Sequence, residues 1–180
     1  MTAVWFLIFV CASFGLTLYL VILGNSVFGG LDFASDERVV AIVTKIIHAY
    51  GKPRAVLYDL GSARGSFATA VAKKFPLLKI FGVDDSWFRT SYAQAQSLFV
   101  TNAHFLNQDI FNTNISQADI LYIYLPQELM LKLEEKLKSE LKPGSVIITN
   151  KVQLPSWQAT KIFSTDAKRP LMNRLFVYTS

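Results

Sequence analysis

Residues 56–65 constrain the fold more than any other part of the chain, because an apolar run there leads into a turn with two glycines. The segment reads Val-Leu-Tyr-Asp-Leu-Gly-Ser-Ala-Arg-Gly, and Asp84 ends the next apolar run about one βαβ unit later. A strand, a glycine turn and a second strand that ends in an acid are typical of nucleotide-type cofactor sites. The pattern predicts a parallel α/β sheet with a site at the carboxyl ends of its strands.

Apolar runs and helical periodicities alternate after residue 35. Ser35 resembles an N-cap, and an apolar stripe from Val39 to Ile47 predicts a helix that ends before Gly51 and Pro53. Further helices are expected at 67–75, at 87–100 and after Pro126. Strands are expected at 55–58, 78–83, 104–107, 119–125 and 145–150, with an antiparallel pair at 162–164 and 174–179. The order predicts a Rossmann-like, doubly wound and mostly parallel sheet.

Residues 3–23 contain no charged side chain. A helix of this length is about 30 Å long, which matches the hydrocarbon core of a bilayer. A cleaved signal peptide is disfavoured because no basic residue precedes the run. We therefore expect a transmembrane anchor at 1–24, a linker at 25–34 and a cofactor-binding domain at 35–180.

All eighteen Lys and Arg residues follow residue 37, which predicts a single-pass membrane protein with its C-terminal domain in the cytoplasm. The single cysteine, Cys11, excludes an intrachain disulfide framework, and the chain offers no metal-ligand cluster. The net charge of +5 is spread along the chain without a nucleic-acid-binding signature. We expect the bilayer as a partner, and neither nucleic acid nor metal.

The expected cofactor is S-adenosylmethionine. A nicotinamide dinucleotide is the rival, but its pyrophosphate favours G-x-G-x-x-G, whereas Ala63 interrupts that spacing here. Asp84 is expected to accept hydrogen bonds from both ribose hydroxyls. The full set of predicted cofactor-binding residues is Asp59, Gly61, Ser62, Gly65, Asp84, Asp85, Trp87 and Asp109.

Three segments of the chain form recognisable motifs: Asp-Leu-Gly-Ser at 59–62, Gly-Val-Asp-Asp-Ser-Trp at 82–87, and Ile-Tyr-Leu-Pro-Gln at 123–127 with the Leu-Glu-Glu-Lys-Leu helix that follows. In these motifs the chain resembles the membrane-anchored seven-strand (class I) methyltransferases that include the ATP synthase c-subunit and adenine nucleotide translocase lysine methyltransferases. Leu154-Pro-Ser-Trp157 is similar to a Phe-Pro-x-Trp segment. Residues 63–66 read Ala-Arg-Gly-Ser where the family has Gly-Asp-Gly-Arg, and an alanine there is strained if its φ is positive.

The resemblance implies methyl transfer from S-adenosylmethionine to a lysine of a membrane-associated protein. For the acceptor site we expect Tyr124, Pro126 and Gln127, with Trp157 as a possible wall. Two alternatives stay open, which are methylation of a lipid or small molecule and a non-catalytic, membrane-tethered nucleotide-binding module.

Overall fold

The computed structural model describes the backbone of residues 2–28 and 36–180, and within the first of these ranges the side chains of residues 4–20 and 24. The chain divides into two compact units, Met1–Asp32 and Phe33–Ser180. The first unit contains helix α1, Thr2–Phe28. This helix continues four residues beyond the anchor boundary predicted at residue 24, and both the rest of the predicted linker and Ser35 lie outside the described residues.

The predicted transmembrane span is not confirmed. Within the part of the chain that the structure describes, no helix combines the length and the apolar character needed to cross a bilayer.

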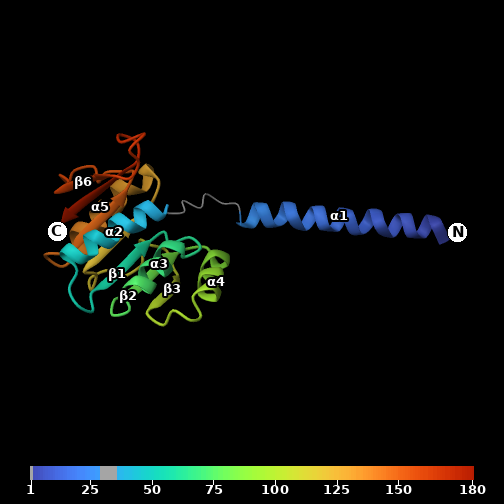
Figure 1. Ribbon diagram of the computed structural model, residues 1–180, viewed down its shortest axis with the longest axis horizontal. Coiled ribbons are helices and arrows are strands. Elements are labelled where there is room, and N and C mark those ends of the chain that lie inside the picture. The colour runs from blue at the N-terminus through green and yellow to red at the C-terminus, as the bar shows by residue number, and fades with distance from the viewer. Residues whose placement is uncertain (1, 29–35) are drawn as a thin grey trace. The chain divides into compact units, whose positions relative to one another are not determined.

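The second unit is built on one seven-stranded sheet with the order β3-β2-β1-β4-β5-β7-β6 (Figure 1). The five strands β1 to β5 are parallel to one another, and β7 pairs antiparallel with both β5 and β6. This confirms the Rossmann-like, mostly parallel sheet and the antiparallel pair at its end. The strands are β1 Val56–Leu60, β2 Lys79–Asp84, β3 Ala103–Asn107, β4 Ile120–Ile123, β5 Val146–Asn150, β6 Lys161–Ser164 and β7 Arg174–Thr179.

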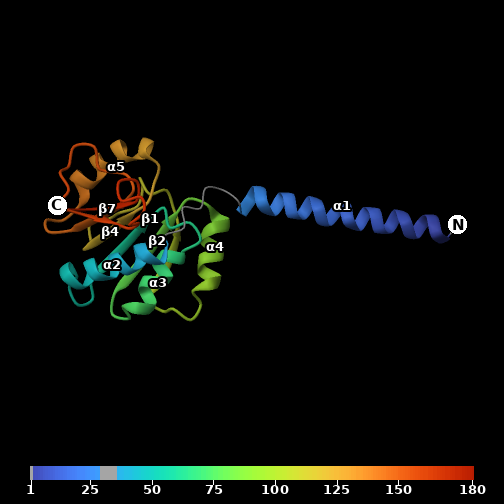
Figure 2. The same cartoon turned by 45° about the horizontal axis from the view of Figure 1, so that its top comes forward.

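Helices cover both faces of the sheet (Figure 2). On one face, α2 (Glu37–Tyr50), α3 (Ser66–Lys74) and α4 (Trp87–Gln96) contribute to a core of aliphatic and aromatic side chains. On the other face, α5 (Gln127–Glu140) buries Met130, Leu133 and Leu137. Because parallel strands are buried on both faces, their sequences are continuous apolar runs, which is why the strands could be recognised.

Most differences from the predicted elements are at their ends, where side-chain hydrogen bonds decide the boundary. Asp36 caps α2 through a hydrogen bond from Arg38 N. Helix α4 ends at Gln96 instead of residue 100, because the Ser97 hydroxyl bonds back to the carbonyls of Ala93 and Gln94. Strand β1 runs two residues further than predicted, so Asp59 lies inside the strand.

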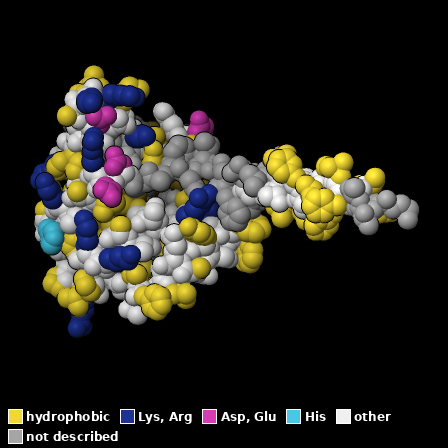
Figure 3. Space-filling view, turned by 45° about the vertical axis from the view of Figure 1, so that its right-hand side comes forward, with side chains coloured by type: hydrophobic (Ala, Val, Ile, Leu, Met, Phe, Trp, Pro, Cys, Tyr) yellow, Lys and Arg dark blue, Asp and Glu magenta, His cyan; other side chains and the backbone are white. Residues whose placement is uncertain are grey.

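The charged side chains form no single basic patch on the face of the domain shown in Figure 3. Lys and Arg side chains are scattered there with Asp and Glu among them. The same view shows hydrophobic side chains at the surface of α1, where Trp5, Phe9 and Phe14 are exposed.

Candidate functional site

The turn after β1 is held against β2 by its backbone. The amides of Gly61 and Ser62 both donate to the Val83 carbonyl, each at 2.9 Å. Gly61 has a φ of +81°, and a Cβ there would lie 2.5 Å from a methyl carbon of Leu125. Gly65, at +73°, is the N-cap of α3, and a Cβ there would lie 2.4 Å from the Phe105 ring. Both positions require glycine, so the turn brings bare backbone to the edge of the sheet.

Ala63 stands where the family has glycine, and it adopts a strained left-handed conformation with a φ of +47°. A left-handed conformation costs a residue with a Cβ about 1–2 kcal/mol. The strained residue is held by a hydrogen bond from Ala63 N to Asp84 Oδ2 at 3.0 Å. The tight turn is therefore preserved without the glycine.

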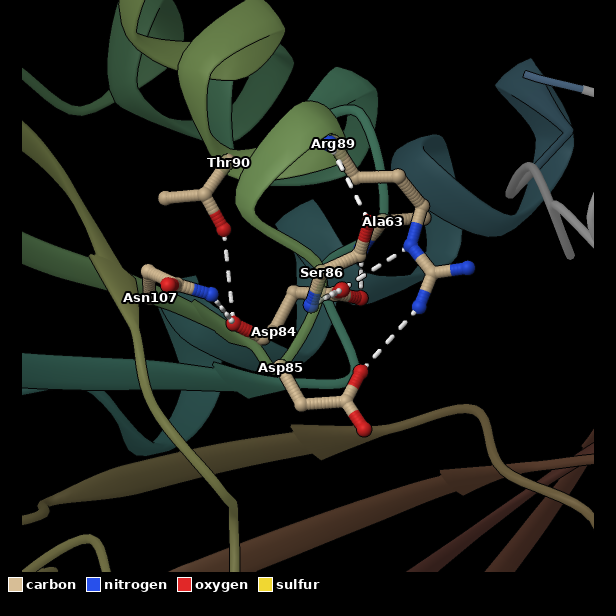
Figure 4. A network of polar contacts seen from close by, with 7 residues as sticks. All are labelled: Ala63, Asp84, Asp85, Ser86, Arg89, Thr90 and Asn107. Carbon is tan, nitrogen blue, oxygen red and sulfur yellow. Dashed lines mark hydrogen bonds and ion pairs between the residues drawn. The ribbon is translucent and has the colours of Figure 1, made fainter. Parts of the chain in front are cut away.

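Asp84, the last residue of β2, is the centre of the polar network in Figure 4. Its Oδ1 accepts hydrogen bonds from Ser86 N and Arg89 Nε, both at 2.9 Å, while Oδ2 accepts the one from Ala63 N. Its backbone carbonyl accepts a hydrogen bond from Asn107 Nδ2 at 3.2 Å. The network fixes the carboxylate of Asp84 beside the glycine turn.

These contacts leave Asp84 little capacity for a further ligand. A carboxylate has about four lone-pair positions, and three are already used by protein donors. One position remains, on Oδ2, whereas two ribose hydroxyls were predicted to bind. The neighbouring Asp85 has a side chain 77% exposed and shares Arg89 with Asp84, through Arg89 Nη2 at 3.3 Å. Asp85 is therefore a suitable acceptor for the second hydroxyl.

Asp59 lies beneath this surface. It is 3% exposed and pairs with Gly82 on one side and Tyr122 on the other. Burial, reinforced by the nearby negative charge of Asp84, raises the pKa of the Asp59 carboxyl to about 8. Its Oδ2 has no hydrogen-bond partner within the described part of the chain. Asp59 therefore holds a proton more tightly than an exposed aspartate does, directly before the glycine turn.

Two other predicted residues flank Asp84. Trp87 begins α4 and is 63% exposed, and its ring packs edge-on against Phe88 at 5.0 Å between centroids. Asp109 lies two residues beyond β3, and its Oδ1 accepts a hydrogen bond from Phe111 N at 2.8 Å. The preceding amide, Gln108 N, donates to the Asp84 carbonyl at 3.0 Å, which attaches this loop to the end of β2.

The predicted acceptor residues follow β4. Pro126 is the N-cap of α5, Gln127 is that helix's exposed first residue, and Tyr124 is half-buried. A Cβ on Gly61 would lie 3.9 Å from the Tyr124 carbonyl, so this segment adjoins the glycine turn. Trp157 is not brought to the same place. It packs with Tyr178 in the core on one face of the sheet, whereas Tyr124 contacts the core on the other face.

Arg89, Asn107 and Asn150 belong to this edge of the sheet, but the sequence interpretation missed them. Arg89 was detectable, because it lies four and five residues after Asp85 and Asp84 at a helix start. Asn107 and Asn150 are the last residues of β3 and β5, which is the position where sites in such sheets are built.

The residues present fit S-adenosylmethionine. The glycine turn forms a backbone cradle at the edge of the sheet, because a Cβ on Gly61 or Gly65 would overlap the neighbouring side chain of Leu125 or Phe105. Asp59 lies buried beneath this turn. Asp84 and Asp85 suit hydroxyl groups. Within the described ranges, no group of three or more His, Cys, Asp or Glu residues is arranged to hold a metal ion.

Comparison with known proteins gives relatives of one chemical class. Over 114 residues the chain is 27% identical to a protein-lysine N-methyltransferase of Saccharolobus islandicus (strain REY15A), covering 62% of this chain and 71% of that protein. It is 29% identical over 111 residues to the O-methyltransferase PaMT of Phomopsis amygdali, covering 58% of this chain but 26% of that protein.

Among solved structures, the fold is similar to an RNA methyltransferase from Salinibacter ruber in complex with S-adenosyl-L-homocysteine. The TM-score is 0.72 at 20% sequence identity, with 81% of this chain and 92% of that chain covered. This similarity agrees with the strand order and identifies the sheet as a class I methyltransferase fold.

Residues 59–161, more than half of the chain, match the ANTKMT methyltransferase domain. The matched segment begins at Asp59 and contains the glycine turn, Asp84 and the predicted acceptor residues. The match confirms the predicted activity class, an S-adenosylmethionine-dependent methyltransferase. The chain belongs to the family of the ANTKMT methyltransferase domain.

Proposed function

We propose that this chain methylates the ε-amine of lysine residues in a membrane-associated protein. The observation that carries the proposal is that the glycine cradle, the Asp84 network and the end of β4 meet at one sheet edge within the segment matched by the family. The lysine-methylating relative, aligned over 62% of the chain, supports lysine as the acceptor.

The chain's residues hold and align the reactants. When bound, S-adenosylmethionine supplies a methyl group on a positively charged sulfur. The turn at Gly61 and Gly65 would position the methionine part, and Asp84 and Asp85 would hold the ribose. The acceptor then approaches from the side of Tyr124, where β4 ends beside the glycine turn.

Methyl transfer is a displacement in which a carbon–nitrogen bond forms as the carbon–sulfur bond breaks. Bound S-adenosylmethionine would supply the methyl group and retain the electron pair of the broken bond, and the methylated amine would lose a proton to solvent. The incoming lysine must be a neutral amine, because an ammonium group has no lone pair. The main contribution expected of the protein is alignment of nitrogen, carbon and sulfur.

The proposed membrane association rests on the first unit of the chain. Residues 3–23 lack charged side chains, and the described large side chains of α1 are exposed. We propose that this segment is a single-pass anchor with the catalytic domain on the cytoplasmic side, where all the basic residues would lie. Tethering would raise the local concentration of an acceptor that is itself in the membrane.

Incubation of the full-length protein with isolated membranes and methyl-deuterated S-adenosylmethionine tests the proposal. Acid hydrolysis and mass spectrometry should find deuterated Nε-methyl-lysine in the protein fraction. The Asp84→Asn variant should lose the label, whereas Glu135→Gln, which changes an exposed carboxylate on α5, should retain it.

The distribution of the label separates lysine from other acceptors. The O-methyltransferase relative makes an oxygen acceptor the second candidate. Label found in the lipid extract, or in protein as a base-labile methyl ester, would favour the oxygen acceptor over lysine. An active preparation that labels neither lysine nor lipid would contradict the proposed acceptor class.

A further inference from the structure

A pocket of about 140 Å³ lies at the carboxyl edge of the sheet. Its walls come from the start of α2, the ends of β4 and β5, and the hairpin of β6 and β7. Tyr124 lines it from the end of β4, and the carbonyl of this residue lies 3.9 Å from the position of a Cβ on Gly61. The pocket therefore adjoins the cradle on the side away from Asp84.

Asn150, the last residue of β5, supplies a buried polar atom to this pocket. It is 3% exposed, and its Nδ2 donates to the Tyr122 hydroxyl at 2.9 Å. Among the residues that the structure describes, its Oδ1 has no hydrogen-bond partner. Because Nδ2 is committed to Tyr122, Oδ1 is the polar atom of this pocket-lining side chain that is left to pair with a ligand donor. An acceptor that is buried without a partner destabilises the fold, so the pocket favours a ligand that carries a donor.

The charged groups around the pocket balance one another. Asp36 and Arg38 lie at the start of α2, Lys151 follows β5, and Asp166 lies in the hairpin. Arg38 and Asp166 approach to 3.9 Å, and the Lys151 Nζ lies 5.3 Å from the centre of the Tyr124 ring. Two positive and two negative side chains leave no net charge to bind an ammonium ion.

A neutral amine fits these conditions. It donates an N–H to an amide oxygen while its lone pair stays available for attack. A buried carboxylate in the position of Asn150 would instead favour the protonated amine, which cannot react. The volume is several times the roughly 30 Å³ that a water molecule occupies in the liquid, so the end of a lysine side chain fits.

We infer that this pocket receives the ε-amine of the acceptor lysine and that Asn150 Oδ1 accepts a hydrogen bond from it. The inference rests on the proposed function and assigns its acceptor subsite. It extends the predicted acceptor segment at 124–127 by a residue from the neighbouring strand.

Binding of two small probes to the full-length protein tests this assignment without turnover. Nα-acetyl-lysine methylamide carries the amine, and Nα-acetyl-norleucine methylamide has a methyl group in its place. In ¹H–¹⁵N spectra of the wild type, the lysine probe should shift the side-chain amide resonances of Asn150, and the norleucine probe should not. Equal shifts with both probes would overturn the inference, and this comparison requires no variant.

Two variants provide a matched pair. Asn150→Leu removes the oxygen and should weaken the lysine probe about tenfold. Tyr122→Phe breaks the same buried hydrogen bond but keeps the oxygen, and should bind the probe within about threefold of the wild type. Calorimetric binding of S-adenosylmethionine should be unchanged in both. A folded Asn150→Leu variant that binds the lysine probe as well as the wild type would also overturn the inference.

The two proposals fail in different ways. A wild type that binds the lysine probe at Asn150 but forms no methyl-lysine would contradict the proposed function and leave the amine subsite intact. An Asn150→Leu variant that methylates lysine as well as the wild type does would contradict the subsite alone.

Discussion

Ala63 shows how one residue can store strain in a binding turn. Its φ of +47° is unfavourable for any residue with a Cβ, and the hydrogen bond to Asp84 keeps it there. Ala63→Gly should therefore raise the free energy of unfolding by about 1 kcal/mol. The same substitution in the middle of α3, Ala70→Gly, should lower it by about 1 kcal/mol.

Denaturant unfolding of the two glycine variants measures both effects. Opposite signs are the expected result. A loss of stability in Ala63→Gly similar to that in Ala70→Gly would show that the left-handed conformation of Ala63 is not strained.

Asp59 predicts an unusual dependence of stability on pH. Its pKa is about 8 in the fold and about 3.8 in the unfolded chain, so the folded protein binds more protons between these values. The contribution of Asp59 to the free energy of unfolding is fully present below about pH 4 and is lost as the pH rises through about 8. The slope reaches at most about 1.4 kcal/mol per pH unit.

Thermal unfolding at pH 5.5, 7 and 8.5 compares the wild type with Asp59→Asn. The asparagine keeps the shape but cannot ionise, so its Tm should fall less across this range than that of the wild type. Parallel curves for the two proteins would mean that Asp59 is ionised in the fold at neutral pH.

At the scale of elements, Gly65 joins α3, α4 and β3. Its φ is +73°, and an added Cβ would lie 2.4 Å from the Phe105 ring of β3 and 2.8 Å from Ala93 of α4. Gly65→Ala should cost more than about 2 kcal/mol, because overpacking adds to backbone strain. Gly144→Ala is the matched control, since its φ is +82° with nothing within 4 Å of the new Cβ.

Urea unfolding of both alanine variants separates packing from strain. Gly144→Ala should lose only about 1 kcal/mol. If the two variants lose equal stability, overpacking at Gly65 adds nothing to the cost of backbone strain. That result would contradict the close packing of α3 and α4 at this residue.

The sequence predicted elements better than it predicted contacts. The strands were recognisable because burial on both faces leaves continuous apolar runs, and the stripe from Val39 to Ile47 is buried as its spacing indicated. The glycine turn and Asp84 could be predicted to lie together, because the carboxyl ends of parallel strands meet at the same edge of a sheet. The unpaired Asn150 oxygen could not be found, because it depends on a cross-strand bond to Tyr122. The same limit applies to Trp157, whose face of the sheet is set by packing.

At the scale of the whole molecule, the proposed anchor can be tested in the intact chain. Arginines introduced together as Phe9→Arg and Leu16→Arg should each oppose insertion by about 2.5–3.5 kcal/mol. The double variant should move from the membrane pellet to the soluble fraction after carbonate extraction. The apolar control, Phe9→Leu with Leu16→Ile, should stay in the pellet. A wild type that is already extracted by carbonate would contradict the anchor.

Calorimetric titration of S-adenosylmethionine into the full-length protein is the most direct test of the central claim, that the turn after β1 and the end of β2 form the cofactor site. The wild type should bind at one saturable site. Asp84→Asn should bind at least about tenfold more weakly, because it loses a charged acceptor and disturbs its bonds to Ala63 and Arg89. Glu135→Gln should bind like the wild type. Equal affinity in folded Asp84→Asn and wild type would contradict the assigned site.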